Sequence, residues 1–366
     1  MSDESGTVLR WPLGLLDTQP AAPGLHSSLI TQHSSLLNSS LLKDSFGRVH
    51  NNLRVSVTDR CNLRCTYCMP EDVTFRDRSE LLTFEEIAAF VRVAASLGVD
   101  KIRLTGGEPL MRKELHKLVR LIVAIPGIKD VGLTTNGILL EEQAKPLFDA
   151  GLRRLNVSLD TLDPTRFRAL TRRDGVEKVL AGLTAAKRAG FDPIKMNAVA
   201  IRGFAEHDVV PLARYARDRG FELRFIEYMP IGADTWEREK VFFAHEILDL
   251  IGREVGELLP ANTDPSAPAL EYNYTDGRGT VGLIASVSRP FCRNCNRIRL
   301  TADGKLRNCL FALDETDVKG LLRVPAIDEQ GIANALRRSV WAKWAGHEIN
   351  AATFVKPDRT MHAIGG

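Results

Sequence analysis

The chain has 366 residues, of which 44% are hydrophobic and 26% are charged, a balance typical of folded globular proteins and not of disordered ones. Its 49 Lys and Arg residues against 46 Asp and Glu residues leave a net charge of +3, so the molecule as a whole is not a nucleic-acid-binding polycation. No run of about 18 apolar residues occurs, which excludes a transmembrane helix.

Residues 1–45 mix Ser and Leu without a helical or strand period. Asp3 and Glu4 stand at the start and Arg10 is nearly alone, whereas a transit peptide is rich in Arg and poor in acidic residues. We therefore predict that residues 1–45 are a disordered N-terminal extension.

From Leu53 onward, short apolar or β-branched runs alternate with amphipathic stretches of helical period. Thr83, with Glu86 three residues later, fits a capping box that opens the first predicted helix. Such alternation predicts parallel strands covered by helices. The predicted strands are Leu53–Thr58, Lys101–Thr105, Asp130–Thr135, Arg154–Ser158, Lys195–Ala200 and Glu222–Glu227, and the predicted helices lie near 83–97, 112–124, 141–149, 176–189 and 206–219.

Six strand–helix units are too few for a closed barrel of eight, which leaves a partial barrel or an open sheet. Polar residues at the carboxyl ends of five strands favour the barrel, because parallel barrels gather their sites on that face. One Thr, Asn or Gly often merely ends a strand, but five strands in succession do not fit that explanation. We predict an α/β partial (β/α)6 TIM-like barrel over residues 46–230. These polar residues are Gly106-Gly107-Glu108, Thr134-Thr135-Asn136, Ser158, Asn197 and Glu227.

After Met229-Pro230 the strand–helix repeat breaks. Residues 231–366 include a loop rich in Pro, Asn and Asp near 260–267 and end in Gly365-Gly366. This region is too short for another large domain, so we predict that it closes the open side of the partial barrel.

The six cysteines fall into two trios. Disulfides suit short secreted chains, whereas this chain is long and its cysteines are crowded. A reducing, cytoplasmic compartment is the better expectation. The trios are Cys61, Cys65 and Cys68, and Cys292, Cys295 and Cys309.

The first trio lies in a loop directly after the first predicted strand. Structural zinc sites usually have four ligands in two pairs, and no fourth Cys or His is near in the sequence. Three thiolates suit a [4Fe–4S] cluster that leaves one iron open for another ligand. The second trio repeats this pattern, with a disulfide plus a free thiol, or half of a zinc site, as the alternatives.

Basic residues recur inside otherwise apolar strands. Arg297 and Arg299 are two apart, so both face the same way in an extended segment. Arg54, Arg103 and Lys195 lie in three other predicted strands. A single such residue is most often solvated at the surface, but the recurrence favours an anion site. Because Arg binds phosphate oxygens in bidentate fashion, we expect a polyphosphate ligand.

Two of these motifs resemble the radical S-adenosylmethionine superfamily. Cys61–Cys68 matches its CxxxCxxC loop, with an aromatic residue before the third Cys, and Thr105–Pro109 matches its GGEP motif. The resemblance implies that the open iron chelates the amino and carboxylate groups of S-adenosylmethionine. One electron, from an electron donor, then breaks the carbon–sulfur bond and gives a 5′-deoxyadenosyl radical.

Two trios spaced in this way, together with the terminal Gly pair, resemble more narrowly the GTP 3′,8-cyclase family of molybdenum cofactor biosynthesis. The resemblance covers about residues 54–366 and implies a lyase with two [4Fe–4S] clusters. The radical would take the C3′ hydrogen of GTP, and C3′ would attack guanine C8 to give (8S)-3′,8-cyclo-7,8-dihydroguanosine 5′-triphosphate after a further reduction. Guanine would lean on the open iron of the second cluster.

The resemblance also assigns roles to individual residues. Cys61, Cys65 and Cys68 would hold the catalytic cluster, and Cys292, Cys295 and Cys309 the second one. S-adenosylmethionine would contact Tyr67, Gly107, Ser158 and Met229. GTP would contact Arg54, Arg103, Thr134, Lys195, Arg297, Ile298 and Arg299. The tail residues Gly365 and Gly366 would reach the active site and activate the enzyme.

Two alternatives to this prediction remain open. One keeps the radical chemistry but acts on another substrate, with the second cluster serving electron transfer. The other is a zinc-stabilised module that binds nucleic acid, against which the near-neutral charge and scattered basic residues weigh. We expect no nucleic acid and no membrane among the partners, and a monomer or homodimer.

Overall fold

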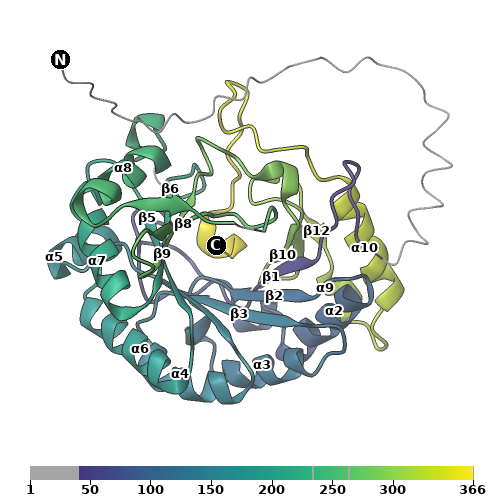
Figure 1. The fold of residues 1–366 in the computed structure, drawn as a ribbon. Helices are drawn as coiled ribbons and strands as arrows, with labels where there is room; N and C mark the ends of the chain where they lie inside the picture. The colour runs from purple at the N-terminus through teal and green to yellow at the C-terminus, as the bar shows by residue number, and fades with distance from the viewer. Residues whose placement is uncertain (1–40, 233–234, 263, 366) are drawn as a thin grey trace, which may run out of the picture. The chain divides into compact units, whose positions relative to one another are not determined.

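The structure is a computed structural model that describes residues 41–366 apart from 233–234, 263 and 366. Its first half alternates strands with helices along the chain (Figure 1). The strands are β1 (Asn52–Ser56), β2 (Lys101–Thr105), β3 (Asp130–Thr135), β4 (Arg154–Ser158), β5 (Ile194–Ala200) and β6 (Glu222–Glu227). All six strands predicted from the sequence are therefore confirmed.

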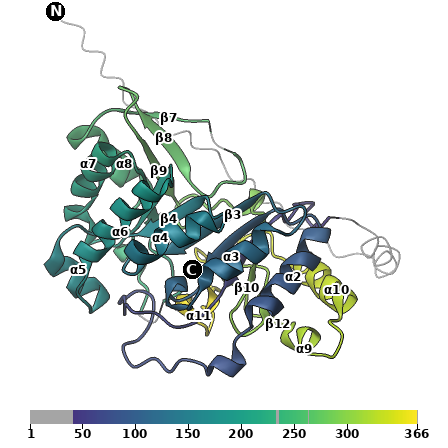
Figure 2. The ribbon, with the colours of Figure 1, turned by 90° about the horizontal axis from the view of Figure 1, so that it is seen from below.

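The helices that follow these strands cover the outer face of the sheet (Figure 2). Thr83 begins the first of them: its hydroxyl accepts from the Glu86 amide at 3.1 Å, and the Glu86 carboxylate accepts from the Thr83 amide at 2.7 Å. The predicted capping box is confirmed. The helices are α2 (Phe84–Ser96), α3 (Leu115–Val123), α4 (Leu140–Asp149), α5 (Pro164–Thr171), α6 (Val176–Ala189), α7 (Val209–Arg219) and α8 (Ala244–Glu254).

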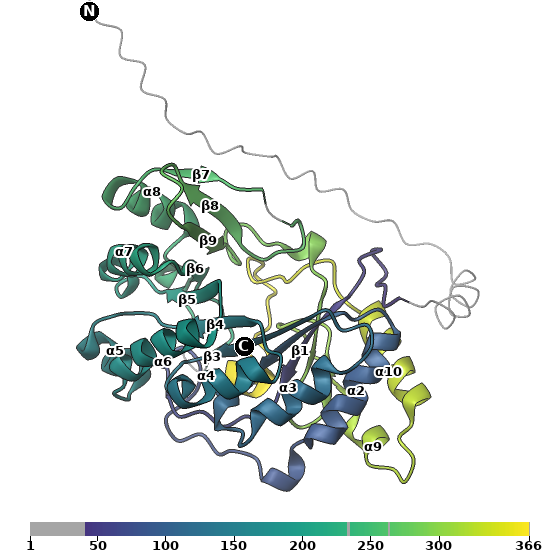
Figure 3. The same cartoon turned by 60° about the horizontal axis from the view of Figure 1, so that its bottom comes forward.

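The C-terminal region adds strands at both edges of this sheet. Beyond β6, β9 (Thr280–Ile284) pairs in parallel and is followed by antiparallel β8 (Leu270–Tyr274) and β7 (Leu258–Pro260) (Figure 3). Beside β1, β10 (Arg297–Leu300) pairs in parallel and leads to antiparallel β11 (Lys305–Arg307) and β12 (Thr316–Asp317). The order β12-β11-β10-β1-β2-β3-β4-β5-β6-β9-β8-β7 is that of a curved sheet that stays open among the described residues.

The predicted partial barrel is thus confirmed, with two more parallel strands than the six expected. The parallel partners of both extra strands lie far away in the sequence, so the regular strand–helix repeat does not predict these strands. The C-terminal helix α11 (Met361–Ile364) lies inside the ring of strands, where it fills part of the opening (Figure 1).

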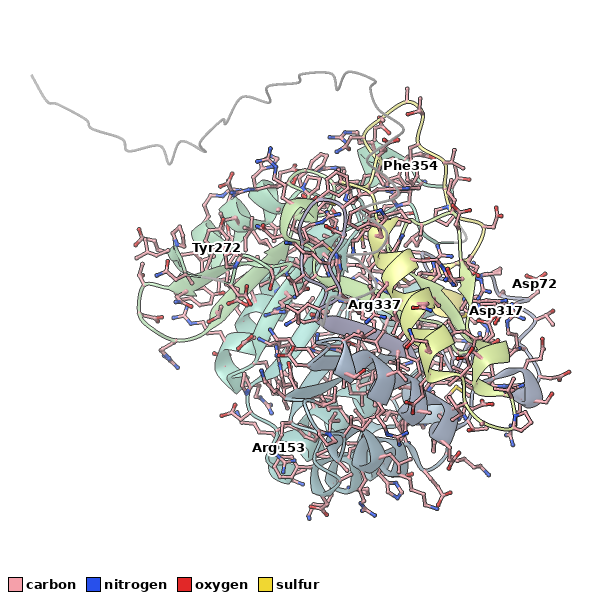
Figure 4. All side chains as sticks on the ribbon, turned by 90° about the vertical axis from the view of Figure 1, so that its right-hand side faces the viewer. Asp72, Arg153, Tyr272, Asp317, Arg337 and Phe354 are labelled. Carbon is pink, nitrogen blue, oxygen red and sulfur yellow. The ribbon has the colours of Figure 1, made fainter. Side chains whose placement is uncertain are left out.

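The remaining elements are short or lie outside the sheet. Helices α9 (Lys319–Leu322) and α10 (Glu329–Trp341) pack beside α2 (Figure 2), and Asp317 of β12 lies at the sheet edge near them (Figure 4). Single 3-10 turns are η1 (Arg78–Glu80), η2 (Pro109–Met111), η3 (Ala205–His207), η4 (Arg238–Lys240) and η5 (Cys292–Asn294).

The main core lies between the sheet and its outer helices. In β1, Leu53 and Val55 are fully buried against this core, and their alternation places Arg54 on the opposite, inner face. A second, smaller apolar cluster forms at the opening of the barrel. Its members are Met229, Ile231, Trp236, Val241, Phe243, Val287, Cys309, Leu310, Phe311, Ile349, Phe354, Met361 and Ile364.

Most of the predicted N-terminal extension, residues 1–40, lies outside the described residues. Residues 41–45 pack on the barrel, because Leu42 is 1% exposed and its amide donates to the Leu97 carbonyl at 3.1 Å. The described residues from Leu41 to Gly365 belong to one compact unit, and the division expected near residue 230 stays a prediction. No helix among the described residues has the length and hydropathy to cross a bilayer.

Candidate active site

Three arginines lie side by side on the inner face of the sheet. The strand register pairs Arg54 of β1 with Arg299 of β10 on one side and with Arg103 of β2 on the other. Arg299 is 6% exposed. The side chains come from segments far apart in the sequence, and only strand pairing brings them into one row.

The second inner row is formed by polar residues of β3 to β6. Thr134 pairs with Asn156, Asn156 with Lys195, and Lys195 with Glu222. Glu222 forms an ion pair with Lys195. This row therefore carries its own carboxylate, whereas within the described chain no carboxylate forms an ion pair with Arg54, Arg103 or Arg299.

Gly132 of β3 makes room for Arg103. A Cβ added at Gly132 would lie 2.2 Å from Nη1 of Arg103, so any side chain there would displace the guanidinium. The guanidinium donates to Oδ1 of Asn156 at 3.4 Å. Gly132 was not among the predicted site residues, although a glycine between apolar strand residues indicates a close approach.

The arginine row is electrostatically costly without an anion. Burial, and then the charges of Arg299, Arg297 and Arg103, lower the pKa of Arg54 well below its usual value. Burial and Arg297 lower the pKa of Arg299 to about 9, and burial lowers the pKa of Arg103 to about 10. A polyphosphate would neutralise these mutually repelling charges, which makes the row a candidate phosphate site.

Arg297 and Ile298 lie outside the row formed by Arg54, Arg103 and Arg299. The Arg297 guanidinium lies 4.4 Å from the centre of the Phe291 ring, close to the second trio. Ile298 is fully buried in the main core, on the opposite face of β10 from Arg299. Only its backbone is therefore available to a ligand on the inner face.

The first trio lies in the loop after β1. The Cys68 amide donates to the Cys65 carbonyl at 2.9 Å, and the Leu63 amide points at the Cys61 sulfur at 3.4 Å. Burial, and then the charge of Cys68, raise the pKa of Cys65 well above its usual value. The thiols are close enough to influence one another, and binding to cationic iron would stabilise their deprotonated forms.

The GGEP loop packs against this cysteine loop. The Gly107 amide donates to the Thr58 carbonyl at 2.8 Å, and the Glu108 amide donates to the Arg60 carbonyl at 2.7 Å. A Cβ added at Gly107 would lie 2.5 Å from the Arg60 carbonyl oxygen. Because backbone is the obstacle, only glycine allows the two loops to approach so closely.

Glu108 links this loop to a cysteine through Asn136. Its buried carboxylate accepts from the Thr135 hydroxyl at 2.7 Å and from the Asn136 amide at 2.7 Å. The Asn136 side chain in turn donates to the Cys61 sulfur at 3.7 Å. Burial raises the pKa of Glu108 to about 7. Sequence reasoning placed both residues at strand ends but gave them no role.

Tyr67, Ser158 and Met229 occupy different surroundings. The Tyr67 hydroxyl donates to Asp160 at 2.8 Å, and burial raises the pKa of Asp160 to about 6. Ser158 ends β4 on the inner face. Met229 packs on the second apolar cluster. Asp160 was not among the predicted site residues, although it is the second residue after β4.

The second trio is built by η5, by Cys295 between η5 and β10, and by the segment after β11. The Cys295 amide donates to the Cys292 carbonyl at 3.1 Å, and Cys309 packs on the second apolar cluster. Burial opposes ionisation of Cys295, but the charges of Arg297 and Lys343 prevail and lower its pKa to about 6.

Both trios fit three-thiolate iron–sulfur clusters by the chemistry of their donors. None of the six cysteines forms a disulfide and all six are partly exposed. The first trio lies in one loop, and the second lies in the segments before β10 and after β11. The fit therefore concerns the type of donor and not the positions of the sulfur atoms, because in the part of the chain that the structure describes no group of three or more His, Cys, Asp or Glu residues is arranged to hold a metal ion.

The C-terminal tail reaches the arginine row. Arg299 donates to the Gly365 carbonyl oxygen. Gly365 has a φ of +85°, and a Cβ added there would lie 2.5 Å from Oγ1 of Thr105. His362 of α11 packs edge-on against Phe75, with 6.2 Å between the ring centres. Gly366 lies outside the described residues.

Two family models match successive parts of the chain. A model of the Radical SAM superfamily matches residues 55–216, and a model described as Molybdenum Cofactor Synthesis C matches residues 221–349. The first covers the cysteine loop, the GGEP loop and β2 to β5. The second covers β6 to β12 and the second trio.

Curated relatives match nearly the whole chain. A protein of Rhodopirellula baltica named GTP 3′,8-cyclase is 47% identical over 331 residues, which cover 89% of this chain and 92% of that protein. A protein of Streptomyces coelicolor with the same name is 46% identical, covering 92% of this chain and 100% of that protein. The chain belongs to the GTP 3′,8-cyclase family.

More distant solved structures share the fold of this GTP 3′,8-cyclase family member. Streptococcus suis SuiB bound to S-adenosylmethionine superposes with a TM-score of 0.58 at 13% identity, covering 85% of this chain and 72% of SuiB. Native anSMEcpe with bound AdoMet superposes with a TM-score of 0.55 at 17% identity, covering 81% of this chain and 82% of anSMEcpe. At such low identity these likenesses concern the partial barrel alone.

Proposed function

We propose that this chain is a radical S-adenosylmethionine lyase that converts GTP to (8S)-3′,8-cyclo-7,8-dihydroguanosine 5′-triphosphate, the first step of molybdenum cofactor biosynthesis. The family to which the chain belongs supports this activity. The observation that carries the proposal is the inner row of Arg54, Arg103 and Arg299, which lies in one barrel with both cysteine trios.

The first trio, Cys61, Cys65 and Cys68, would hold the catalytic [4Fe–4S] cluster. When bound, this cluster and S-adenosylmethionine supply a radical that can abstract hydrogen from an unactivated ribose carbon. The chain contributes the placement: Glu108 holds Asn136 against Cys61, and Gly107 lets the GGEP loop reach the cysteine loop. Tyr67, Gly107, Ser158 and Met229 would contact S-adenosylmethionine.

The inner face would hold GTP. Arg54, Arg103 and Arg299 would bind the triphosphate by charge-assisted hydrogen bonds, and Lys195 would add a fourth positive charge from β5. Thr134 is on the neighbouring inner row. Arg297 and the Ile298 backbone would continue the contact toward the second trio.

The second trio, Cys292, Cys295 and Cys309, would hold the second cluster beside the guanine end of the substrate. Arg299 already holds Gly365 at the phosphate end, so the tail Gly365-Gly366 would act as an element of the active site. This assignment gives the tail a role that a solvated terminus would not have.

Anaerobic incubation with GTP, S-adenosylmethionine and a reductant tests the proposal. We expect 5′-deoxyadenosine and a cyclic GTP-derived product in comparable amounts, both measured by liquid chromatography and mass spectrometry. Deoxyadenosine without a GTP-derived product would reject GTP as the substrate while leaving the radical chemistry in place.

An external electron donor supplies the electron for cleavage of S-adenosylmethionine. The protein acts in the cytoplasm, where thiols stay reduced. It works as a monomer or homodimer without nucleic acid or membrane.

A further inference from the structure

A buried lysine lies against the second cysteine trio. Lys343 is 5% exposed, and its ammonium donates to the Cys295 sulfur at 3.5 Å and to the Arg297 carbonyl oxygen at 2.6 Å. It follows the last turn of α10, where its amide donates to the Val340 carbonyl at 3.1 Å. Lysine is almost never buried this deeply unless it is paired.

The negative charges that face this ammonium come from thiols. Among the described residues, no carboxylate forms an ion pair with Lys343, and the favourable charges beside it are those of Cys295 and Cys309. Arg297 and His50 are the basic groups nearby. The thiols of the second trio, and no acidic side chain among the described residues, therefore explain why the Lys343 ammonium is buried here.

The loop that carries Lys343 is held in place by Arg48. The Arg48 guanidinium donates to the Cys292 carbonyl at 2.7 Å, to the Trp344 carbonyl at 2.6 Å and to the Ala345 carbonyl at 2.8 Å. One side chain thus ties the first cysteine of the trio to the segment after Lys343. Arg48 therefore joins three segments of the chain: its own, the one that carries Cys292, and the one that follows Lys343.

We propose that Lys343 is a positioning residue that raises the reduction potential of the second cluster and aligns that cluster with the strand that binds GTP. This rests on the proposed function, because it needs a cluster on the second trio. A reduced cluster carries one more negative charge, so a cation that hydrogen-bonds a cluster thiolate stabilises the reduced form. The second bond, to the Arg297 carbonyl, fixes the start of β10.

The test uses the reconstituted, full-length protein under anaerobic conditions, with a redox titration followed by electron paramagnetic resonance. We expect Lys343→Met to lower the midpoint potential of the second cluster and Lys343→Gln to lower it less, because the amide keeps a hydrogen-bond donor. Lys343→Arg should stay near the wild-type potential. Lys129→Met is the matched control, since the Lys129 side chain is 77% exposed and paired with Asp100.

The first cluster should keep its potential in every variant. A second readout is the yield of cyclic product per deoxyadenosine, which should fall in Lys343→Met while cleavage of S-adenosylmethionine continues. An unchanged second-cluster potential in Lys343→Met with full iron content would overturn the proposal. If Lys343→Met loses the second cluster, the Gln variant decides: an unchanged potential there overturns the proposal equally.

Iron analysis of the wild-type protein separates this inference from the proposed function. Two clusters correspond to about eight irons per chain. A wild-type protein that binds only about four irons at the first trio would reject the second cluster, and Lys343 with it. Full iron with an insensitive potential would reject Lys343 alone.

Discussion

The two cysteine trios place the same thiol chemistry in opposite electrostatic surroundings. Burial and the negative charge of Glu108 raise the pKa of Cys61 to about 11. At the second trio, Arg297 and Lys343 overcome the effect of burial and lower the pKa of Cys295 to about 6. The surroundings of Cys61 therefore disfavour a further negative charge, whereas those of Cys295 attract it.

This contrast matches the charges of the two proposed ligands. S-adenosylmethionine carries a sulfonium cation, and the acidic groups Glu108 and Asp160 lie near its trio. GTP is a polyanion, and the arginine row adjoins the other trio. Three cysteines by themselves therefore do not show which ligand a cluster serves. The charged side chains around each trio distinguish the proposed S-adenosylmethionine site from the proposed GTP site.

The largest expected effect separates the trios outright. Cys65→Ser should abolish cleavage of S-adenosylmethionine, because two thiolates do not hold a cluster with one open iron. Cys295→Ser is the matched variant and should keep that cleavage while losing the cyclic product. Deoxyadenosine is measured in both; its production by Cys65→Ser would contradict the assignment of the first trio.

The pH dependence of stability tests the basic surroundings of the second trio, because the charge of Lys343 also acts on His50. Burial, and then the Lys343 charge, lower the pKa of His50 from 6.5 to about 4. The contribution of the neutral His50 ring to the free energy of unfolding is therefore fully present above pH 6.5. It is lost as the pH falls toward 4, by up to about 3 kcal/mol. Thermal unfolding across this range measures the effect.

His50→Gln is the control for this prediction, because it removes the titrating ring but keeps a donor for Asp44, which His50 contacts at 2.9 Å. The variant should show a flatter stability profile between pH 6.5 and 4. An equally steep profile would assign the pH dependence to other groups.

Loss of one guanidinium should weaken binding of the anionic ligand, GTP, and leave binding of the cationic ligand, S-adenosylmethionine, unchanged. Arg297→Ala should reduce GTP affinity by about 10- to 100-fold, or roughly 1.5–3 kcal/mol for a charge-assisted hydrogen bond. Calorimetric titration of the reconstituted protein with GTP measures this, and binding of S-adenosylmethionine serves as the internal control. Unchanged GTP affinity would remove Arg297 from the site.

The smallest effect concerns the protein without ligand. Arg54→Met should raise the free energy of unfolding of the unliganded protein by about 1 kcal/mol, because the substitution relieves repulsion with Arg299 and Arg103. The thermal midpoint should rise with it. The same variant should lose the extra stabilisation that GTP gives. A lower midpoint without GTP would mean that Arg54 contributes to the fold and not only to binding.

Prediction from the sequence succeeded where the signal was local. The strands β1 to β6 follow from apolar alternation, and the Thr83 capping box from two residues three apart. It failed for β9 and β10 as members of the parallel sheet, since their partners β6 and β1 are distant in the sequence. Ile298 shows the same limit: its buried side chain faces away from the ligand side.

The spacing of the cysteines by itself indicated a three-thiolate cluster, because a loop of a few residues can present its thiols to one cluster wherever it lies. The radical chemistry was implied by the resemblance of the cysteine loop and the GGEP residues to a known superfamily. Only the tertiary structure decided that Arg54, Arg103 and Arg299 form one row, that Gly132 clears space for a guanidinium, and that Lys343 reaches Cys295. These are contacts between distant segments, and they depend on strand pairing and burial, which no local pattern encodes.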